Sequence, residues 1–259
     1  MTTEEIKLWG NKNESSMTIY VPDNKTTSCA VLIFPGGAYR MLAEHEGKGY
    51  AEFFASYGIL SVVVKYRVAP NKFPEPLQDA QRALQYLRYY AKKYSIDKNK
   101  IVVMGSSAGA HLAATLSTYR AFIAENGDEI SKEDIIPNAQ VLCYGVLALN
   151  KPYAHPGSSR NFLGEGGESL GDSLSPILIA DEKTPQAFLW HTWADDSVSV
   201  INSLEYVKRL REKGVKAELH VFPDGKHGLG LAFGENKVCQ YVSKWSELLL
   251  KWLQYIEFC

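Results

Sequence analysis

The sequence predicts an α/β protein with a mostly parallel central sheet and helices on both faces, on three observations. Short apolar runs alternate along the chain with longer segments that have helical spacing. Several of these runs are continuously apolar, as at residues 29–34 and 101–104, which is typical of strands buried on both faces. No internal repeat or shift in composition divides residues 1–259, so we predict a single domain.

Each element follows from the local pattern of apolar residues and breakers. The expected strands span residues 6–9, 17–21, 29–34, 58–64, 101–104, 139–144, 187–192 and 217–222. The expected helices span residues 46–57, 77–94, 110 to about 124, 199–213 and 235–255. The last strand alternates polar and apolar residues, which indicates a sheet edge. Residues 145–183 lack periodicity and are rich in glycine, serine and proline, so we interpret them as a long, lid-like loop without a large cap domain.

Composition excludes several classes of protein. A net charge of -1 with 22% charged residues gives no electrostatic basis for binding nucleic acid or an anionic membrane. The polar N-terminus lacks the apolar core of a signal peptide, and no apolar run has the length of a membrane span. Because the 4 cysteines are scattered, we expect a reduced, cytoplasmic protein. The expected partner is a small-molecule substrate, and a homo-oligomer is left open.

The residues that follow strand 101–104 carry the strongest chemical pattern in the chain. Gly105-Ser106-Ser107-Ala108-Gly109 has the Gly-x-Ser-x-Gly spacing, and an alanine- and leucine-rich helix begins at once. In this strand–turn–helix context the pattern indicates a nucleophile elbow, which lifts a serine hydroxyl above the sheet. We therefore predict that Ser107 is a nucleophile. The alternative is that the small residues only let the helix approach the strand closely.

A serine hydroxyl needs a base, and a carboxylate must orient that base. In this kind of fold the acid and then the histidine follow the serine along the chain. His227 is the histidine that follows a late strand in a short loop, residues 223–228. The loop after strand 187–192 supplies Asp195 and Asp196, and we favour Asp195 as the acid. In that case Asp196 caps the next helix or is solvated; the alternative is that both form a turn.

Backbone amides that could stabilise a developing negative charge lie at two places. Ala108 follows the predicted nucleophile, and Gly37-Ala38 lies in the turn after strand 29–34. We predict that these three residues form an oxyanion hole. The sequence has no HExxH motif, no histidine and cysteine cluster and no GxGxxG loop, so we expect neither a metal nor a cofactor.

Residues near these turns are candidates for substrate contact. Tyr39 stands directly beside the predicted oxyanion turn. His155, Arg160 and Asn161 lie in the long loop that is expected to flank the site.

Taken together, these motifs resemble those of the α/β-hydrolase esterases, in particular the acetyl-xylan or carbohydrate esterases related to the hormone-sensitive-lipase-like branch. The motifs that carry the resemblance are Phe34–Tyr39, Tyr66–Pro70, Pro76–Ala80, Gly105–Gly109, His191–Val198 and Phe222–Leu231. The resemblance implies an α/β-hydrolase fold with Ser107 as nucleophile, Asp195 as orienting acid and His227 as base. Ala38 stands where many relatives have glycine, which we expect to be tolerated if its φ is negative.

The predicted function is hydrolysis of short-chain carboxylic esters by a Ser-Asp-His triad through an acyl-enzyme. Acetyl groups on a carbohydrate or another small alcohol are the first expectation, partly because no long apolar segment precedes residue 29 to shelter a fatty chain. The alternatives are an amidase, a formamidase or a small-peptide hydrolase that uses the same triad. A non-catalytic binding relative is the third hypothesis.

Overall fold

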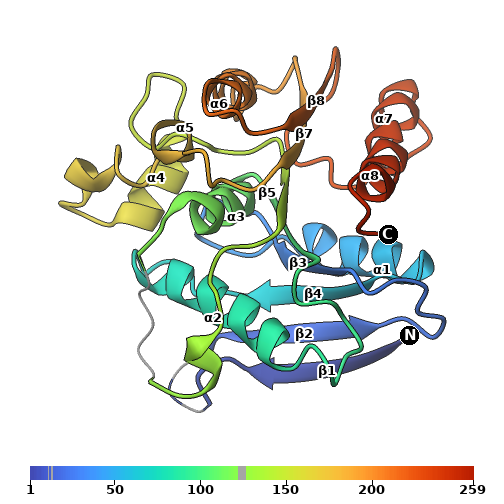
Figure 1. Ribbon diagram of the computed structural model, residues 1–259. Coiled ribbons are helices and arrows are strands. Elements are labelled where there is room, and N and C mark those ends of the chain that lie inside the picture. Colours follow the sequence, from blue (N-terminus) through green and yellow to red (C-terminus); the bar gives the residue numbers. More distant parts are fainter. Residues whose placement is uncertain (11, 13, 122–126) are drawn as a thin grey trace.

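A computed structural model describes residues 1–10, 12, 14–121 and 127–259, and its centre is one sheet (Figure 1). In the described part of the chain this sheet has 8 strands in the order β1-β2-β4-β3-β5-β6-β7-β8. The strands are β1 (Thr2–Lys7), β2 (Ser16–Val21), β3 (Ala30–Phe34), β4 (Leu60–Lys65), β5 (Ile101–Ser106), β6 (Ala139–Cys143), β7 (Ala187–Thr192) and β8 (Ala217–Phe222). Strand β2 runs antiparallel to β1 and β4, and every other neighbouring pair is parallel. The predicted mostly parallel sheet is confirmed.

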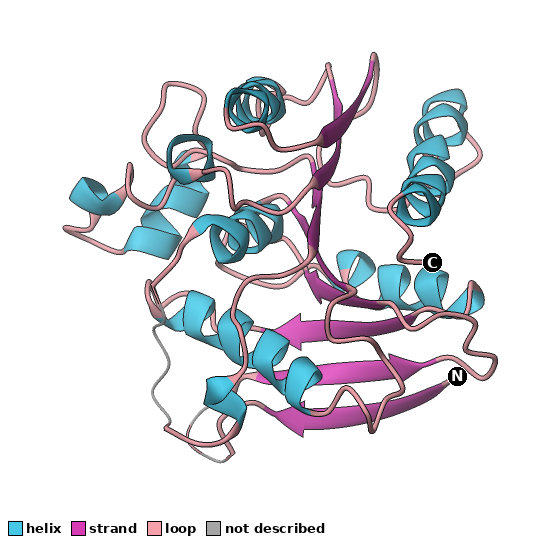
Figure 2. Ribbon diagram, viewed as in Figure 1, coloured by secondary structure: helices cyan, strands magenta, loops and turns pink. Residues whose placement is uncertain are grey.

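Helices cover both faces of this sheet (Figure 2). The α-helices are α1 (Lys48–Ser56), α2 (Glu75–Tyr89), α3 (Ala108–Thr118), α4 (Pro156–Leu163), α5 (Pro176–Ile179), α6 (Ile201–Glu212), α7 (Lys237–Val242) and α8 (Lys244–Tyr255). Short 3₁₀ turns lie at Glu44–Glu46, Ile130–Lys132 and Glu168–Leu170. None of the helices within the described residues is both long enough and apolar enough to cross a membrane.

Two apolar cores form because side chains of a strand alternate between the faces of the sheet. In β5, Ile101 and Val103 pack into the core that contains α2, α3 and α6. Val102 and Met104 point the other way, into the core that contains α1 and α8. A strand that is buried on both faces therefore needs apolar side chains facing both cores, as residues 101–104 of β5 provide.

The boundaries of several elements differ from the sequence prediction. The last helix is interrupted at Ser243 and forms α7 and α8, and the lid-like segment 145–183 contains α4 and α5. Both of these short helices begin at a proline, which suits the first helical position because no amide hydrogen is needed there. The helix that starts after the nucleophile turn ends at Thr118, and Ala124, where we expected its end, lies outside the described residues.

Glycines at the turn after β5 let helix α3 approach the sheet closely. A Cβ atom on Gly105 would lie 2.1 Å from the carbonyl oxygen of Gly109. A Cβ atom on Gly109 would lie 2.0 Å from the carbonyl oxygen of Phe34 in β3. These neighbours are backbone atoms that cannot rotate away, so both positions require glycine.

Substitution of Gly109 should therefore disturb the fold at this crossing. We expect Gly109→Ala to lower the free energy of unfolding by about 1–3 kcal/mol, the usual cost of overpacking, and to reduce activity. Gly49→Ala in α1 is the matched control, because nothing lies within 4 Å of its added Cβ. Denaturant unfolding of both variants measures the effect, and equal stabilities would contradict the prediction.

Candidate active site

Ser107 occupies the turn between β5 and α3, and its backbone conformation is unusual. Its φ of 54° and ψ of -118° lie outside the regions that side-chain-bearing residues prefer. The turn is fixed by its neighbours: the Ser107 amide donates to the Cys143 carbonyl at 2.9 Å. The residue is 8% exposed, so it is largely buried but not closed off from solvent. This is the geometry of a nucleophile elbow.

Three side chains from far apart in the sequence meet at the carboxyl edge of the sheet. The His227 Nε2 atom lies 2.8 Å from the Ser107 Oγ, and its Nδ1 lies 2.7 Å from the Asp195 Oδ2. Because a carboxylate only accepts, Nδ1–H donates to Asp195, which leaves Nε2 free to accept the serine proton. The Asp195 side chain is fully buried, whereas that of His227 is 20% exposed.

The Asp195 carboxylate is held by four donors. Its Oδ1 accepts the amides of Ser197 at 3.0 Å and Val198 at 2.9 Å, and its Oδ2 accepts His227. The Nε2 of His191 lies 3.3 Å from the same Oδ2. Burial alone would raise the pKa of this carboxyl, but hydrogen bonds from His191, His227 and Val198 outweigh it and hold the pKa well below its usual range. The carboxylate is therefore ionised at neutral pH.

The structure distinguishes the two adjacent aspartates. Asp196 is exposed, and its Oδ1 accepts the Ser197 hydroxyl at 3.2 Å. Asp195, and not Asp196, contacts His227, as the sequence analysis favours. His191 was missed as a partner of Asp195, because it lies inside the β7 strand. The one indication in the sequence is a histidine within an otherwise mostly apolar, buried strand.

In the turn after β3, the N–H groups of two residues point outward. The Gly37 carbonyl accepts the Arg40 amide at 3.0 Å, and the Gly36 carbonyl accepts the Ala43 amide at 2.9 Å. In a trans peptide the N–H points opposite to the C=O of the same unit. The amides of Gly37 and Ala38 therefore point out of the turn.

Strand pairing brings this turn beside the elbow. Phe34 of β3 lies opposite Gly105 of β5, so the turns that follow the two strands are neighbours. A Cβ on Gly36 would lie 3.1 Å from the Cβ of Ser107. The Ala108 amide is in the first turn of α3, where amides have no partner within the helix. The three predicted oxyanion donors thus belong to two adjacent turns.

The condition under which an alanine was expected to be tolerated in this turn is not met. Ala38 and Tyr39 each have a φ of 56°, in the left-handed region. The left-handed conformation costs about 1–2 kcal/mol for a residue with a side chain. Contacts from outside the turn offset that cost: the Asn161 Nδ2 donates to the Ala38 carbonyl at 2.8 Å.

The structure also corrects the candidate contact at Tyr39. Its side chain is fully buried, and its hydroxyl donates to the Nδ1 of His111 at 2.8 Å, while the His111 Nε2–H donates to the Leu174 carbonyl at 2.8 Å. Tyr39 therefore packs behind the turn and does not face a substrate. Burial lowers the pKa of His111 to about 4 despite its bond to Leu174, so this ring is neutral at pH 7.

The other three candidate contacts lie on or beside α4. The Asn161 amide is used to hold the turn. The His155 Nδ1 accepts the Ser158 amide at 3.1 Å, which leaves the proton of the neutral ring on Nε2. Burial and the nearby His227 lower the pKa of His155, against an opposing effect of Asp195, so His155 lies within electrostatic range of the site. Arg160 is exposed and lines a hollow of about 210 Å³.

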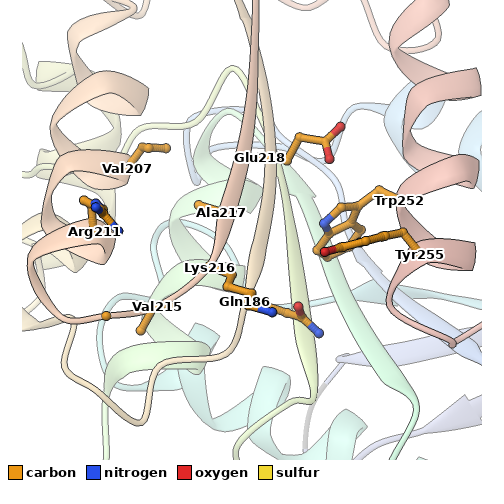
Figure 3. Close-up of a pocket in the computed structure, with 10 residues that line it drawn as sticks. Gln186, Val207, Arg211, Val215, Lys216, Ala217, Glu218, Trp252 and Tyr255 are labelled. Carbon is orange, nitrogen blue, oxygen red and sulfur yellow. The ribbon is translucent and has the colours of Figure 1, made fainter.

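A separate hollow of about 450 Å³ lies along the edge strand β8 (Figure 3). Val207 and Arg211 of α6 border it on one side, and Trp252 and Tyr255 of α8 border it on the other. Lys216, directly before β8, also lines it. The hollow is therefore at the amino ends of the last strands, whereas the triad is at their carboxyl ends.

A serine on a strand–turn–helix elbow, with a histidine from a late loop, defines the α/β-hydrolase class. The comparison with protein families agrees: the BD-FAE family profile matches residues 17–210. The chain belongs to the BD-FAE family.

Known proteins that resemble this chain include two curated relatives and one solved structure. Endo-1,4-beta-xylanase B of Butyrivibrio fibrisolvens is 32% identical over 88% of this chain, and acetylxylan esterase of Xylanibacter ruminicola is 29% identical over 84%. The chain spans 36% and 44% of the lengths of these two relatives. The acetyl ester-xyloside bifunctional hydrolase of Caldicellulosiruptor lactoaceticus is 39% identical, with a TM-score of 0.90 over 98% of this chain and 97% of that one.

The two aspartates provide a direct test of the site. We expect Asp195→Asn to lower kcat by about 10,000-fold, because the amide would favour the wrong histidine tautomer. The matched substitution Asp196→Asn changes an exposed carboxylate that has no contact with the imidazole, and should leave kcat within about twofold. Steady-state kinetics on a short-chain ester compares the two variants. Equal losses would contradict the assignment.

Buried His111 should make stability depend on pH. Between about pH 6.5 and pH 4 the unfolded chain binds a proton at this ring and the folded chain does not, so unfolding becomes easier as pH falls. The neutral, buried His111 ring contributes up to about 3 kcal/mol to the free energy of unfolding. This contribution is fully present above about pH 6.5 and is lost as the pH falls to about 4. His111→Gln should show a smaller fall in stability from pH 7 to pH 4.5, measured by urea unfolding. An unchanged fall would contradict the prediction.

Proposed function

We propose that this protein is a serine esterase that hydrolyses short-chain carboxylic esters, with Ser107, His227 and Asp195 as its triad. The observation that carries the proposal is the continuous chain of hydrogen bonds from Asp195 through His227 to the Ser107 hydroxyl, at 2.7 and 2.8 Å. Each bond has the donor and acceptor roles that proton transfer from serine requires.

In the first half of the reaction, the Ser107 oxygen attacks the acyl carbon as His227 Nε2 takes its proton. The buried Asp195 carboxylate stabilises the imidazolium that forms. The carbonyl oxygen becomes an oxyanion, which the amides of Gly37, Ala38 and Ala108 stabilise; loss of one such donor typically costs about 100- to 1,000-fold in kcat. The imidazolium then gives its proton to the leaving alkoxide, and an acyl-serine remains.

In the second half, water takes the place of the alcohol. His227 removes a proton from the water as its oxygen attacks the acyl-serine, and the same three amides stabilise the second oxyanion. Collapse of this intermediate returns the proton to Ser107 and releases the carboxylic acid. The enzyme is regenerated, and no metal or cofactor enters either half.

We infer that the acyl group is acetyl and that the alcohol is a carbohydrate. The support comes from the relatives: one is an acetylxylan esterase, and the similar solved structure is an acetyl ester-xyloside hydrolase. The segment between β6 and β7 adds two short helices, α4 and α5, and a 3₁₀ turn rather than a large cap, which fits a small acyl group better than a long chain.

The test of the proposed function is Ser107→Ala. Turnover of a chromogenic acetate should fall by at least about 1,000-fold, because the remaining groups cannot form the acyl-enzyme. Ser117→Ala is the matched control: this serine lies on the same helix, and its hydroxyl donates to the Ala113 carbonyl, away from the triad. Retained turnover in Ser107→Ala would reject the proposal. Parallel assays with N-formyl amides and dipeptides separate an esterase from an amidase or peptidase.

A further inference from the structure

A buried carboxylate lies behind the proposed oxyanion turn and takes no part in the triad. Glu46 ends the 3₁₀ turn Glu44–Glu46 and is 3% exposed, whereas Glu44 and His45 in the same turn are exposed. Burying a carboxylate is costly unless hydrogen bonds replace the water that it loses. Its two oxygens therefore have to find donors inside the protein.

The first oxygen holds the oxyanion turn. Glu46 Oε2 accepts the Gly36 amide at 2.8 Å. The carbonyl of the same peptide unit, that of Pro35, accepts the Tyr66 hydroxyl at 2.6 Å. The peptide unit that precedes the Gly37 and Ala38 amides is thus fixed at both ends.

Gly36 fits closely between the carboxylate and the elbow. A Cβ there would lie 2.5 Å from Glu46 Oε2 and 2.8 Å from the Ser106 carbonyl oxygen. A shift of the carboxylate would therefore be passed to the turn directly.

The second oxygen reaches the loop that carries the catalytic histidine. Glu46 Oε1 accepts the Tyr144 hydroxyl proton at 2.6 Å, and the Tyr144 oxygen accepts the Gly230 amide at 3.0 Å. The Tyr144 ring packs edge-on against the His227 imidazole, with 5.1 Å between ring centroids. One carboxylate therefore connects the turn that would bind the oxyanion with the loop that positions the base.

Neutral groups supply these hydrogen bonds. Within the described residues, the recorded ion-pair partner of Glu46 is His45, whose Nε2 is 3.8 Å from Oε1 and 3.0 Å from the Gly228 carbonyl oxygen. A glutamine would fill the same space, but it offers one acceptor and one donor in place of two acceptors. With glutamine, either the Gly36 amide or the Tyr144 hydroxyl would therefore face the side-chain NH₂ group, which is a donor, in place of an accepting oxygen.

We propose that Glu46 is a positioning residue for ester hydrolysis: through its two oxygens it aligns the oxyanion turn with the His227 loop. This inference rests on the proposed function, since it assumes the roles of Ser107, His227 and the turn amides. The stabilisation that it supports is needed in the transition state rather than in the bound substrate. Its loss should therefore lower kcat more than it raises KM.

The test compares Glu46→Gln with Glu44→Gln, the same change at an exposed position of the same turn. Glu46→Gln should lower kcat on a short-chain acetate by about 10- to 100-fold, less than the largest losses for a direct oxyanion donor, with KM changed by less than about threefold. Glu44→Gln should leave both constants unchanged. An unchanged kcat, or a loss confined to KM, in folded Glu46→Gln would overturn the proposal.

A second readout separates positioning from mere stability. An alkyl trifluoromethyl ketone adds to the serine and places an oxyanion in the hole, so its affinity should fall by the same factor as kcat/KM in Glu46→Gln. A loss of thermal stability with full affinity for this inhibitor would show a purely structural role.

Tyr144→Phe removes the connection to the histidine loop and keeps the ring. It should also lower kcat, and combined with Glu46→Gln the loss should be smaller than the product of the single losses. If Glu46→Gln does not fold, an unchanged kcat in Tyr144→Phe overturns the proposal. Activity retained in Ser107→Ala rejects the proposed function itself, whereas an inactive Ser107→Ala with an unaffected Glu46→Gln rejects only the role of Glu46.

Discussion

At Ser107 the chain must leave a buried strand and enter a helix within one residue, with a φ of 54°. That turn forms only because Gly105 and Gly109 let the backbones of β3, β5 and α3 approach to distances that a side chain would block. The same close approach places the Ala108 amide beside the serine and brings residues 36–38 alongside. The positions of the proposed nucleophile and of the proposed oxyanion donors therefore have one common cause.

Two buried carboxylates belong to the site that surrounds this turn. Asp195 is buried and ionised because several donors converge on it, among them the rings of His191 and His227. In the proposed mechanism it fixes the tautomer of His227 and stabilises the cation that forms when this histidine takes up a proton. Glu46 is a second buried carboxylate, and it is bound mainly by amide and hydroxyl donors. In our proposals the first carboxylate orients the base, and the second positions the backbone that surrounds the reacting atoms.

The sequence predicted the features that depend on local patterns. Strands 187–192 and 217–222 agree with β7 and β8 residue for residue, and Asp195 was favoured over its neighbour from its place in the chain. Features that depend on tertiary contacts were missed: nothing near Glu46 in the sequence indicates that its partners are 10 and 98 residues away. The positive φ of Ala38 could not be foreseen for the same reason, since the Asn161 contact that supports it comes from a distant helix.

We propose that Ser107 is activated by His227, whose Nε2 lies 2.8 Å from its hydroxyl oxygen. The most direct measurement is labelling of the folded protein with a fluorophosphonate, followed by mass spectrometry of its peptides. An activated Ser107 predicts one label per chain, on the peptide that contains residues 105–109, and no label after unfolding or in the His227→Ala variant. Labelling of another residue, or labelling that is as fast without His227, would contradict the claim.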